Sequence, residues 1–282
     1  MGFIMKKVVI LGSNGMLGHS LLKNIKNCQL FGFQRKKTER ENIIVVNDFF
    51  SDDFYTKLDE LSPDIIINCV GVIKQKDISN DIVHTLPINS IFPHLLAQYA
   101  QKNNSRLIHF STDCIFDGTE GMYNDDHPFS AKDIYGISKY LGEVRDNPST
   151  LTLRVSIIGH GIEPNDSLID WFISQNGKHV KGYINAYFSG LPCNEIANIL
   201  TEYIIPNENL VGLYNLSTEK ISKFNLLKIV AEKYNLNIKI EKCDSLIIDR
   251  SLNSERFKKA TGYKNKTWPD LIGLMKEDYN AL

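Results

Sequence analysis

The segment LGSNGMLG, close to the N-terminus, constrains the fold of this chain more than any other. It places Gly12, Gly15 and Gly18 between a short apolar run and a segment of helical period. Glycines there allow a tight turn, let backbone N–H groups approach a pyrophosphate and let a helix pack closely on a strand. The spacing is G-x-x-G-x-x-G, which alone is weak evidence, but its place after the first apolar run predicts a dinucleotide-binding βαβ unit. The cofactor contacts expected from this loop are Gly12, Asn14, Gly15, Met16, Leu17 and Gly18.

Short β-rich apolar runs alternate with helical segments over the first half of the chain, as in a parallel sheet built from βαβ units. Each run is almost continuously apolar, which is typical of strands covered on both faces. We expect strands at 7–11, 29–33, 43–46, 64–69, 106–110 and 151–155, and helices at 16–27, 89–102 and 135–145. The predicted fold class is α/β, a Rossmann-type doubly wound parallel sheet.

The regular alternation ends after Ser156, where helices are expected near 166–175, 195–204, 222–234 and 269–278. We therefore predict a dinucleotide-binding domain over 1–155 and a smaller, partly discontinuous substrate-binding domain over 156–282. Part of 185–216 is expected to return to the first domain, because a strand signal at 212–216 can join its sheet.

Composition and charge exclude several partners. The 32 basic and 33 acidic residues leave a net charge of -1, so neither nucleic acid nor an anionic membrane is expected. No stretch approaches the roughly 20 apolar residues of a spanning helix, and the first residues are too short for a signal peptide, so we expect a cytoplasmic protein. Five widely spaced cysteines fit a reducing compartment, and the seven histidines show no metal-ligand spacing, so no metal is expected. The sequence does not determine an oligomeric state, and a homodimer is compatible with it.

Basic residues stand at the end of the second expected strand. A site for NAD normally carries an acidic residue there, about 20 residues after the glycine loop. Here Gln34 is followed by Arg35, Lys36 and Lys37, and cations in this place would pair with a 2′-phosphate. The sequence therefore favours NADP(H) over NAD(H), the alternative being a solvated basic loop. Asp48, after the third expected strand, is expected to reach the adenine amino group.

Three residue types with matched chemistry follow the fifth expected strand. Thr112 comes directly after this strand, and Tyr135 and Lys139 lie one turn apart at the start of the next helix. All three should meet at the carboxyl ends of the strands, where open α/β sheets bind ligands. The Lys139 ammonium is expected to lower the pKa of the phenol from about 10, so that Tyr135 can deliver a proton. Thr112 would polarise a carbonyl to which a hydride is added, whereas the alternative is a strand-end cap beside an ordinary aromatic.

The strings FSTDCIFDG (110–118), YGISKYLGE (135–143) and LTLRVSIIG (151–159) resemble an extended short-chain dehydrogenase/reductase of the dTDP-4-dehydrorhamnose reductase family. The resemblance covers nearly the whole chain. This family reduces the 4-ketone of a nucleotide-diphosphate 6-deoxysugar with NAD(P)H, which implies catalytic roles for Thr112, Tyr135 and Lys139. The resemblance also implies cofactor contacts from Cys69, Gly71, Tyr135 and Lys139 and substrate contacts from Lys74, Thr112, Asp113 and Arg250.

The chain departs from this family at several places. Cys114 stands where the family usually has a tyrosine. The strings NCVGVIKQK (68–76), GYINAYFSGL (182–191) and DRSLNS (249–254) look closer to reductases of UDP-linked 2-acetamido-4-keto-6-deoxysugars. The resemblance then implies a sugar nucleotide of an L-rhamnosamine-type pathway, used for glycan precursors, with Arg250 at its diphosphate.

Three alternatives stay open from the sequence. The chain could be a dTDP-4-dehydrorhamnose reductase, or an epimerase of the same fold that holds NAD tightly. It could also be a non-catalytic nucleotide-binding subunit, because the β subunit of methionine adenosyltransferase resembles the same family.

Overall fold

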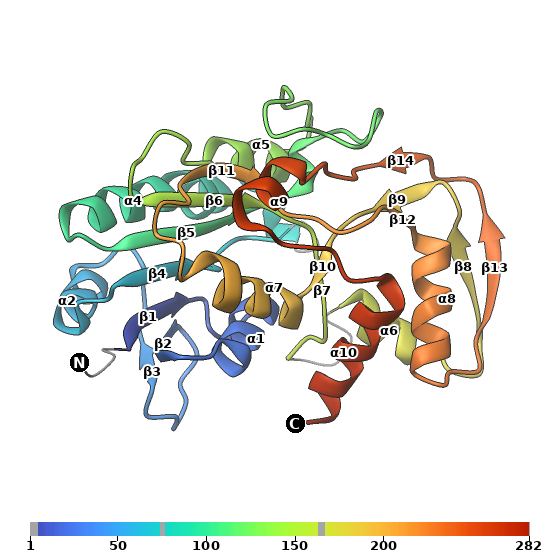
Figure 1. The fold of residues 1–282 in the computed structure, drawn as a ribbon, viewed down its shortest axis with the longest axis horizontal. Coiled ribbons are helices and arrows are strands. Elements are labelled where there is room, and N and C mark those ends of the chain that lie inside the picture. Colours follow the sequence, from blue (N-terminus) through green and yellow to red (C-terminus); the bar gives the residue numbers. More distant parts are fainter. Residues whose placement is uncertain (1–4, 74–76, 163–166, 282) are drawn as a thin grey trace.

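The computed structural model describes residues 5–73, 77–162 and 167–281. Its centre is a seven-stranded parallel sheet in the order β11-β6-β5-β4-β1-β2-β3 (Figure 1). The strands are β1 (Lys6–Leu11), β2 (Cys28–Gln34), β3 (Ile43–Val45), β4 (Ile65–Asn68), β5 (Arg106–Ser111), β6 (Thr150–Arg154) and β11 (Gly212–Asn215). Since the strand order reverses between β1 and β4, a ligand crevice is expected at their carboxyl ends. The prediction of a doubly wound α/β fold is confirmed.

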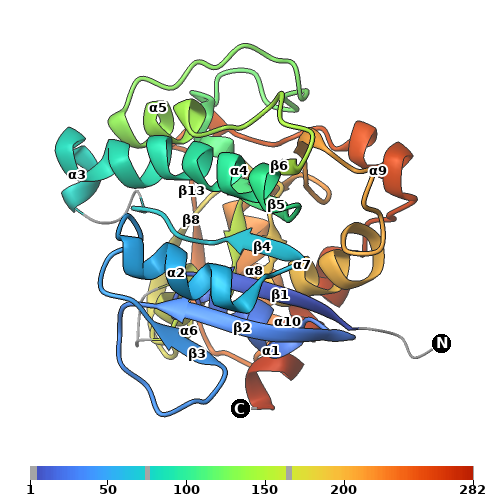
Figure 2. The same cartoon turned by 90° about the vertical axis from the view of Figure 1, so that its left-hand side faces the viewer.

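Helices cover both faces of this sheet (Figure 2). Val8 and Ile10 of β1 pack with residues of α1 and α7, whereas Val9 and Leu11 pack with residues of α2 and α4. All four side chains are fully buried, which explains why β1 reads as a continuous apolar run. The covering helices are α1 (Met16–Asn24), α2 (Asp52–Leu61), α4 (Phe92–Lys102) and α7 (Cys193–Ile199).

The later part of the chain builds smaller sheets beyond the carboxyl ends of the central strands (Figure 1). One of these sheets has three strands, β12 (Ile221–Ser222), β9 (Ala186–Phe188) and β14 (Ile248–Asp249). The others pair β8 (His179–Tyr183) with β13 (Lys239–Cys243) and β7 (Ile157–Ile158) with β10 (Leu191–Pro192). The helices here are α6 (Leu168–Ile173), α8 (Lys223–Lys233), α9 (Glu255–Thr261) and α10 (Trp268–Asn280).

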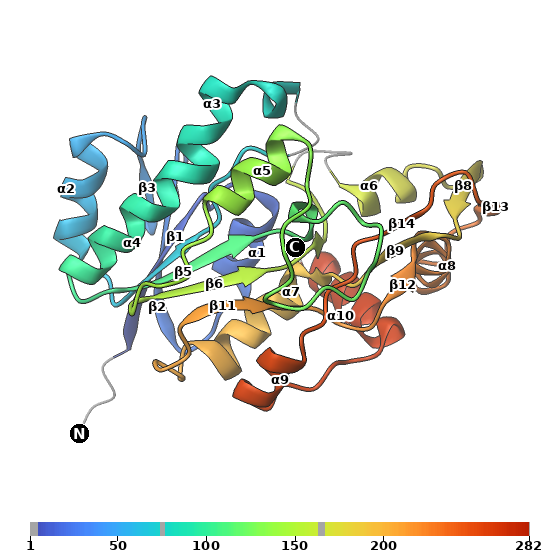
Figure 3. The ribbon, with the colours of Figure 1, turned by 90° about the horizontal axis from the view of Figure 1, so that it is seen from above.

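The chain passes more than once between its two parts. After β10 it enters α7, which packs on α1, and then β11, which extends the central sheet beside β6. Figure 3 shows β11 at this edge of the sheet, with α9 next to it. A single buried cluster contains residues from α1, α7, α8 and α10. One continuous core therefore joins the sheet to the helices of the later part.

Short helical segments complete the described chain. They are η1 (Asp77–Asn80), α3 (Ile82–Leu86), the π-helical turns η2 (Pro87–Ile91) and η4 (Leu200–Ile204), η3 (Asp113–Ile115) and α5 (Ile134–Leu141). α5 begins next to its capping residue Asp133, whose side chain accepts a hydrogen bond from the Gly136 N–H. Within the described residues, every helix is too short or too polar to cross a bilayer.

Candidate active site

The glycine loop joins β1 to α1 in a conformation that other residues would disturb. Gly12 has a φ of +78°, and the N–H groups of Gly12 and Ser13 donate to the Phe33 carbonyl at 2.9 and 3.1 Å. A Cβ on Gly18 would lie 2.2 Å from the Gly12 carbonyl oxygen, so the absence of a side chain lets α1 pack against the loop. Gly15 caps α1 and offers no side chain to its first N–H groups, which suits this terminus to an anion.

A cavity of about 270 Å³ lies beside this loop. The expected cofactor residues that line it are Gly12, Asn14, Gly15, Arg35, Asp48, Cys69 and Gly71. Phe50 and Ile88 add apolar surface to the same walls. A helix N-terminus, a cation and apolar walls in one cavity fit a dinucleotide, whose phosphates need the first two and whose adenine needs the third.

The remaining cofactor residues predicted from this region lie elsewhere. The Leu17 side chain is buried in the core, and Gly18 packs against Gly12, so both support the loop from behind. Met16 lines a separate cavity of about 520 Å³ between α1, α6 and α10. Lys36 is exposed and is not among the residues that line the coenzyme cavity. The two basic residues look equivalent in the sequence, but in the structure only Arg35 lines the cavity.

Gln34 connects the glycine loop to the basic segment. Its buried side chain accepts a hydrogen bond from the Ser13 hydroxyl at 3.1 Å and donates to the Lys36 carbonyl at 2.6 Å. In the sequence, Gln34 is visible only as the residue that precedes the basic segment. Its contacts hold that segment against the loop.

Thr112, Tyr135 and Lys139 come together at the end of β5. The Lys139 ammonium donates to the Phe110 carbonyl at 2.7 Å, which anchors α5 to the strand. The Thr112 hydroxyl donates to Asp113 Oδ1 at 3.2 Å and accepts from the Cys114 N–H at 3.1 Å. It also hydrogen-bonds the Tyr135 phenol.

Burial controls the protonation of this group. Burial raises the pKa of the Tyr135 phenol, Cys114 raises it further, and the Thr112 hydrogen bond opposes them. Burial also lowers the pKa of Lys139 to about 8, against the charge of Glu143. The expectation of a lowered pKa for the phenol is therefore wrong here, because desolvation raises it. The phenol is protonated at neutral pH, which is the form a proton donor requires.

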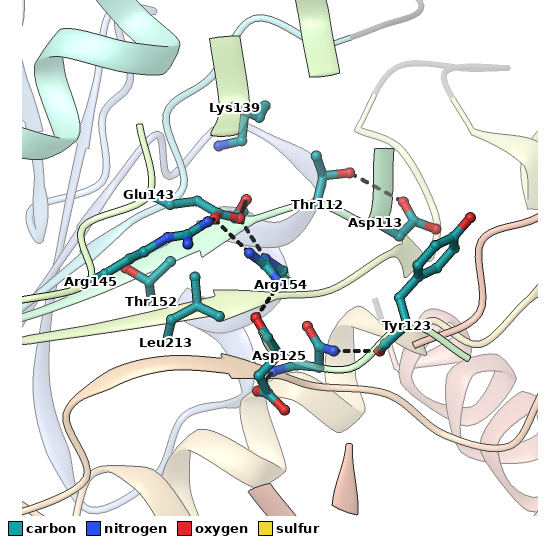
Figure 4. A network of polar contacts seen from close by, with 12 residues as sticks. Thr112, Asp113, Tyr123, Asp125, Lys139, Glu143, Arg145, Thr152, Arg154 and Leu213 are labelled. Carbon is teal, nitrogen blue, oxygen red and sulfur yellow. Dashed lines mark hydrogen bonds and ion pairs between the residues drawn. The ribbon is translucent and has the colours of Figure 1, made fainter. Parts of the chain in front are cut away.

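A buried ionic network underlies these residues (Figure 4). The fully buried Glu143 carboxylate accepts from Arg154 Nε and Nη2 at 2.7 and 2.9 Å, from Arg145 Nη2 at 2.7 Å and from the Ser111 hydroxyl at 2.8 Å. It joins the end of α5 to β5 and β6, so it fixes the distance from Lys139 to the strand ends. The signal for this network is the arginine at 154, a charge inside an apolar strand.

Asn89 provides a second brace, which no sequence motif indicates. This fully buried amide accepts from the Val72 N–H at 2.9 Å and donates to the Val72 carbonyl at 3.0 Å. It also donates to the Ser138 hydroxyl at 3.0 Å. The loop after β4, which lines the coenzyme cavity, is thereby held against the helix that carries Tyr135.

The later part of the chain places Arg250 beside the catalytic loop. Its Nε donates to the Phe116 carbonyl at 2.8 Å, and its Nη1 lies 3.8 Å from the Cys114 sulfur. Asp113 is buried, which raises the pKa of its carboxyl, and the charge of Arg250 opposes this shift. Lys74, predicted as a further substrate contact, lies outside the described residues.

Neither a cluster of metal-binding side chains nor a disulfide occurs in the part of the chain that the structure describes. These residues contain no group of three histidine, cysteine, aspartate or glutamate side chains arranged to hold a metal ion. The five cysteines, all among the described residues, form no disulfide with one another. The candidate site consists of the cavity beside the glycine loop and the nearby group of Thr112, Tyr135 and Lys139.

Known proteins are similar to this chain in sequence and in fold. Residues 5–268 match the family described as RmlD substrate binding domain. Methionine adenosyltransferase 2 subunit beta of Danio rerio is 24% identical over 252 residues, which are 82% of this chain and 75% of that protein. The probable low-salt glycan biosynthesis reductase Agl14 of Haloferax volcanii is 37% identical over 106 residues, which are 36% of this chain and 35% of that protein.

Two solved structures illustrate the likeness of the fold. The dTDP-4-dehydrorhamnose reductase of Bacillus anthracis, in complex with NADP, has a TM-score of 0.85 and 19% identity, covering 99% of this chain and 100% of that chain. WbmG of Bordetella bronchiseptica, in complex with NAD and UDP, has a TM-score of 0.77 and 19% identity, covering 99% and 96%. Since the family match spans almost the whole sequence, the chain belongs to the RmlD substrate-binding-domain family.

Proposed function

We propose that this chain, an NAD(P)-dependent oxidoreductase of the nucleotide-sugar 4-ketoreductase type, uses NADPH to reduce a UDP-linked 2-acetamido-4-keto-6-deoxyhexose. One observation carries the proposal. Thr112, Tyr135 and Lys139 meet at the end of β5, near a cavity whose lining suits a dinucleotide, and Arg250 lies beside Cys114 of the same loop. The product would be an amino-deoxysugar donor for glycan assembly.

Each residue of the site has a separate role in such a reduction. Bound NAD(P)H supplies a hydride to carbon 4 of the sugar. The Thr112 hydroxyl holds the ketone oxygen, and the protonated Tyr135 phenol gives that oxygen its proton. Lys139, anchored on the Phe110 carbonyl, stabilises the phenolate left on Tyr135.

The preference for a UDP sugar rests on the residues around Cys114. A thiol stands there in place of the usual tyrosine, and it lies against Arg250. Among the fold neighbours, WbmG is in complex with UDP. Among the relatives, Agl14 is named as a reductase of glycan biosynthesis.

The preference for NADPH rests on Arg35. Its guanidinium side chain lines the coenzyme cavity where NAD sites usually have a carboxylate. Fold neighbours are in complex with either coenzyme, NADP in the Bacillus anthracis reductase and NAD in WbmG. The cation at position 35 is therefore the feature of this chain that favours the phosphorylated coenzyme.

A panel of 4-keto nucleotide sugars tests the proposal, with NADPH oxidation followed at 340 nm as the readout. We expect the UDP-linked 2-acetamido-4-keto-6-deoxyhexose to be reduced faster than dTDP-4-dehydrorhamnose. Faster oxidation with the dTDP sugar would overturn the UDP preference alone. No oxidation with either sugar would overturn the reductase assignment.

The similarity to methionine adenosyltransferase 2 subunit beta supports a second candidate, a nucleotide-binding subunit without catalysis. The two candidates differ in a simple observation. A regulatory subunit would bind the coenzyme with no turnover on any sugar of the panel. The arrangement of Thr112, Tyr135 and Lys139 favours the enzyme.

A further inference from the structure

We propose that Lys223 binds the β-phosphate of the sugar nucleotide together with Arg250, so that two cations from the later part of the chain hold the end of the diphosphate nearest the sugar. The inference deepens the proposed function and rests on it. Neither the sequence pattern nor the family resemblance assigns a role to Lys223.

The three-stranded sheet carries both cations, each directly after one of its outer strands. Its central strand is β9, which pairs with β12 through Ile221 and Phe188 and with β14 through Asp249 and Tyr187. Lys223 follows β12 directly, and its ammonium lies 4.4 Å from the centre of the Phe188 ring. Arg250 follows β14 directly and reaches the Cys114 sulfur. The sheet thus brings two distant segments to one point of the site.

The surroundings of Lys223 are poorly suited to a cation. It is the first residue of α8, where the helix macrodipole is positive. Its ammonium contacts the Phe188 ring. It makes no hydrogen bond or ion pair with any residue that the structure describes. Burial lowers the pKa of Lys223, and the charges of Asp113 and Cys114 oppose this shift. A cation held at a helix N-terminus beside a second cation is a binding site for an anion.

The local charge matches a diphosphate. Lys223 and Arg250 both act on the single carboxylate of Asp113, whose own ionisation is disfavoured by burial. Two cations and a helix N-terminus therefore face at most one negative charge. A dianionic group such as a diphosphate would balance them.

The position of these cations indicates which of the two phosphates they bind, the β-phosphate. Cys114 lies two residues after Thr112, and its carbonyl oxygen would be 2.4 Å from a Cβ on Gly136, the neighbour of Tyr135. The cations beside Cys114 are thus close to the reacting ketone. Because the sugar is attached to the β-phosphate, this phosphate is the charged group nearest the catalytic residues.

Titration of UDP and UMP into purified full-length variants by calorimetry tests the inference. dTDP and dTMP are titrated as well, and the variants are compared with the pair of nucleotides, uridine or thymidine, that binds the unmodified protein more tightly. We expect Lys223→Met to weaken diphosphate binding about tenfold or more and to change monophosphate binding less than twofold. Lys223→Arg should keep most of the affinity, because it keeps the charge.

Lys220→Met is the matched control. Lys220 precedes the same helix and lies 4.8 Å from the Tyr187 ring, but its ammonium bonds Asp249 at 3.0 Å. We expect this change to leave the preference for the diphosphate unaltered. Unchanged melting temperature and NADPH affinity show that each variant is folded, and Lys223→Gln replaces Lys223→Met if the latter is not.

The outcomes separate this inference from the proposed function. An equal loss of UDP and UMP affinity, or no loss, in the Lys223 variants would overturn the β-phosphate contact. Absence of NADPH oxidation by the unmodified enzyme overturns the reductase assignment but leaves the nucleotide titrations interpretable. If the unmodified protein binds neither UDP nor dTDP, both proposals are wrong.

Discussion

Tyr135 has to be protonated before it can act as an acid, and desolvation of its phenol, which raises the pKa, ensures this at neutral pH. Replacing it by phenylalanine removes only the hydroxyl. We therefore expect Tyr135→Phe to lower kcat by about 10² to 10⁴-fold, the usual contribution of a general acid, with NADPH affinity unchanged. Steady-state kinetics and coenzyme fluorescence titration measure the two effects. A variant with near-normal turnover would show that another group donates the proton.

Arg35 and Lys36 are adjacent, but only Arg35 lines the coenzyme cavity. Arg35→Gln should weaken NADPH about tenfold or more and NADH much less, since a charge-assisted hydrogen bond to the 2′-phosphate is lost. Lys36→Gln is the matched control, with a smaller expected effect. Dissociation constants for both coenzymes measure the difference. Equal weakening of NADPH and NADH by Arg35→Gln would mean that Arg35 does not read the phosphate.

At the residue level, the sequence identifies groups whose chemistry is visible in a short motif. Thr112, Tyr135 and Lys139 belong to this class, and the structure brings them together. Asn89 and Lys223 could not be identified in the same way, because their roles depend on contacts with segments distant in the sequence, Ser138 for Asn89 and the Asp113 loop for Lys223. The direction of the Tyr135 pKa shift could not be predicted either, since it depends on burial, which no local sequence pattern reports.

At the level of elements, α1 depends on a glycine at its packing surface. Gly18→Ala would place a Cβ 2.2 Å from the Gly12 carbonyl, so the helix must shift from the loop. We expect a loss of about 1–3 kcal/mol in the free energy of unfolding, as for other overpacked sites, together with weaker coenzyme binding. Gly273→Ala in α10 is the control, because no atom lies within 4 Å of the added Cβ and helix propensity favours alanine. Thermal denaturation distinguishes the two, and equal stability would contradict the packing role of Gly18.

The α5 helix couples its lysine to a buried carboxylate one turn later. Lys139 has a pKa of about 8, so it is cationic below this pH and neutral above it, and kcat/KM should fall as the pH rises past 8. The charge of Glu143 raises the pKa of Lys139. Glu143→Gln should therefore move this fall to lower pH. The pH dependence of kcat/KM for both proteins measures the shift.

Glu143→Gln also leaves Arg154 buried without its counter-ion, which should cost about 3–5 kcal/mol of stability. Arg145→Gln is the control for this effect, because it removes a partly exposed partner and keeps the buried pair. If the pH profile of Glu143→Gln coincides with that of the unmodified enzyme, Glu143 only supports the structure.

The elements of the central sheet were predictable because buried parallel strands are continuously apolar. All seven strands of this sheet overlap a predicted strand, including β3 and the late strand β11. β8 and β13 were not predicted, because most of their residues are exposed or half-buried and neither strand forms a continuous apolar run. Helix α2 was also missed, although Ser51 caps it and two aspartates occupy its first turn.

At the scale of the whole molecule, the chain closes its site by docking a late segment on an early loop. Asp249 N–H donates to the Gly118 carbonyl at 2.7 Å, and Tyr123 N–H donates to the Ser251 carbonyl at 3.0 Å. These bonds place Arg250 beside Cys114. The sequence indicated that a second part exists, but contacts between residues more than 100 positions apart determine where it docks.

In the proposed function, the diphosphate of the substrate both binds the docked segment and positions the ketone. Arg250 lies near the Thr112 loop, so binding energy from the phosphates can orient the reacting carbon toward Thr112 and Tyr135. We therefore expect the free 4-keto sugar, without its nucleotide diphosphate, to lose kcat as well as affinity. Arg250→Lys should raise KM for the sugar nucleotide and leave NADPH affinity unchanged, because lysine cannot reproduce the bidentate geometry of a guanidinium. Saturation kinetics with the intact and truncated substrates measure both effects. A free sugar that reaches the same kcat at high concentration would show that the diphosphate contributes only to binding and does not position the ketone.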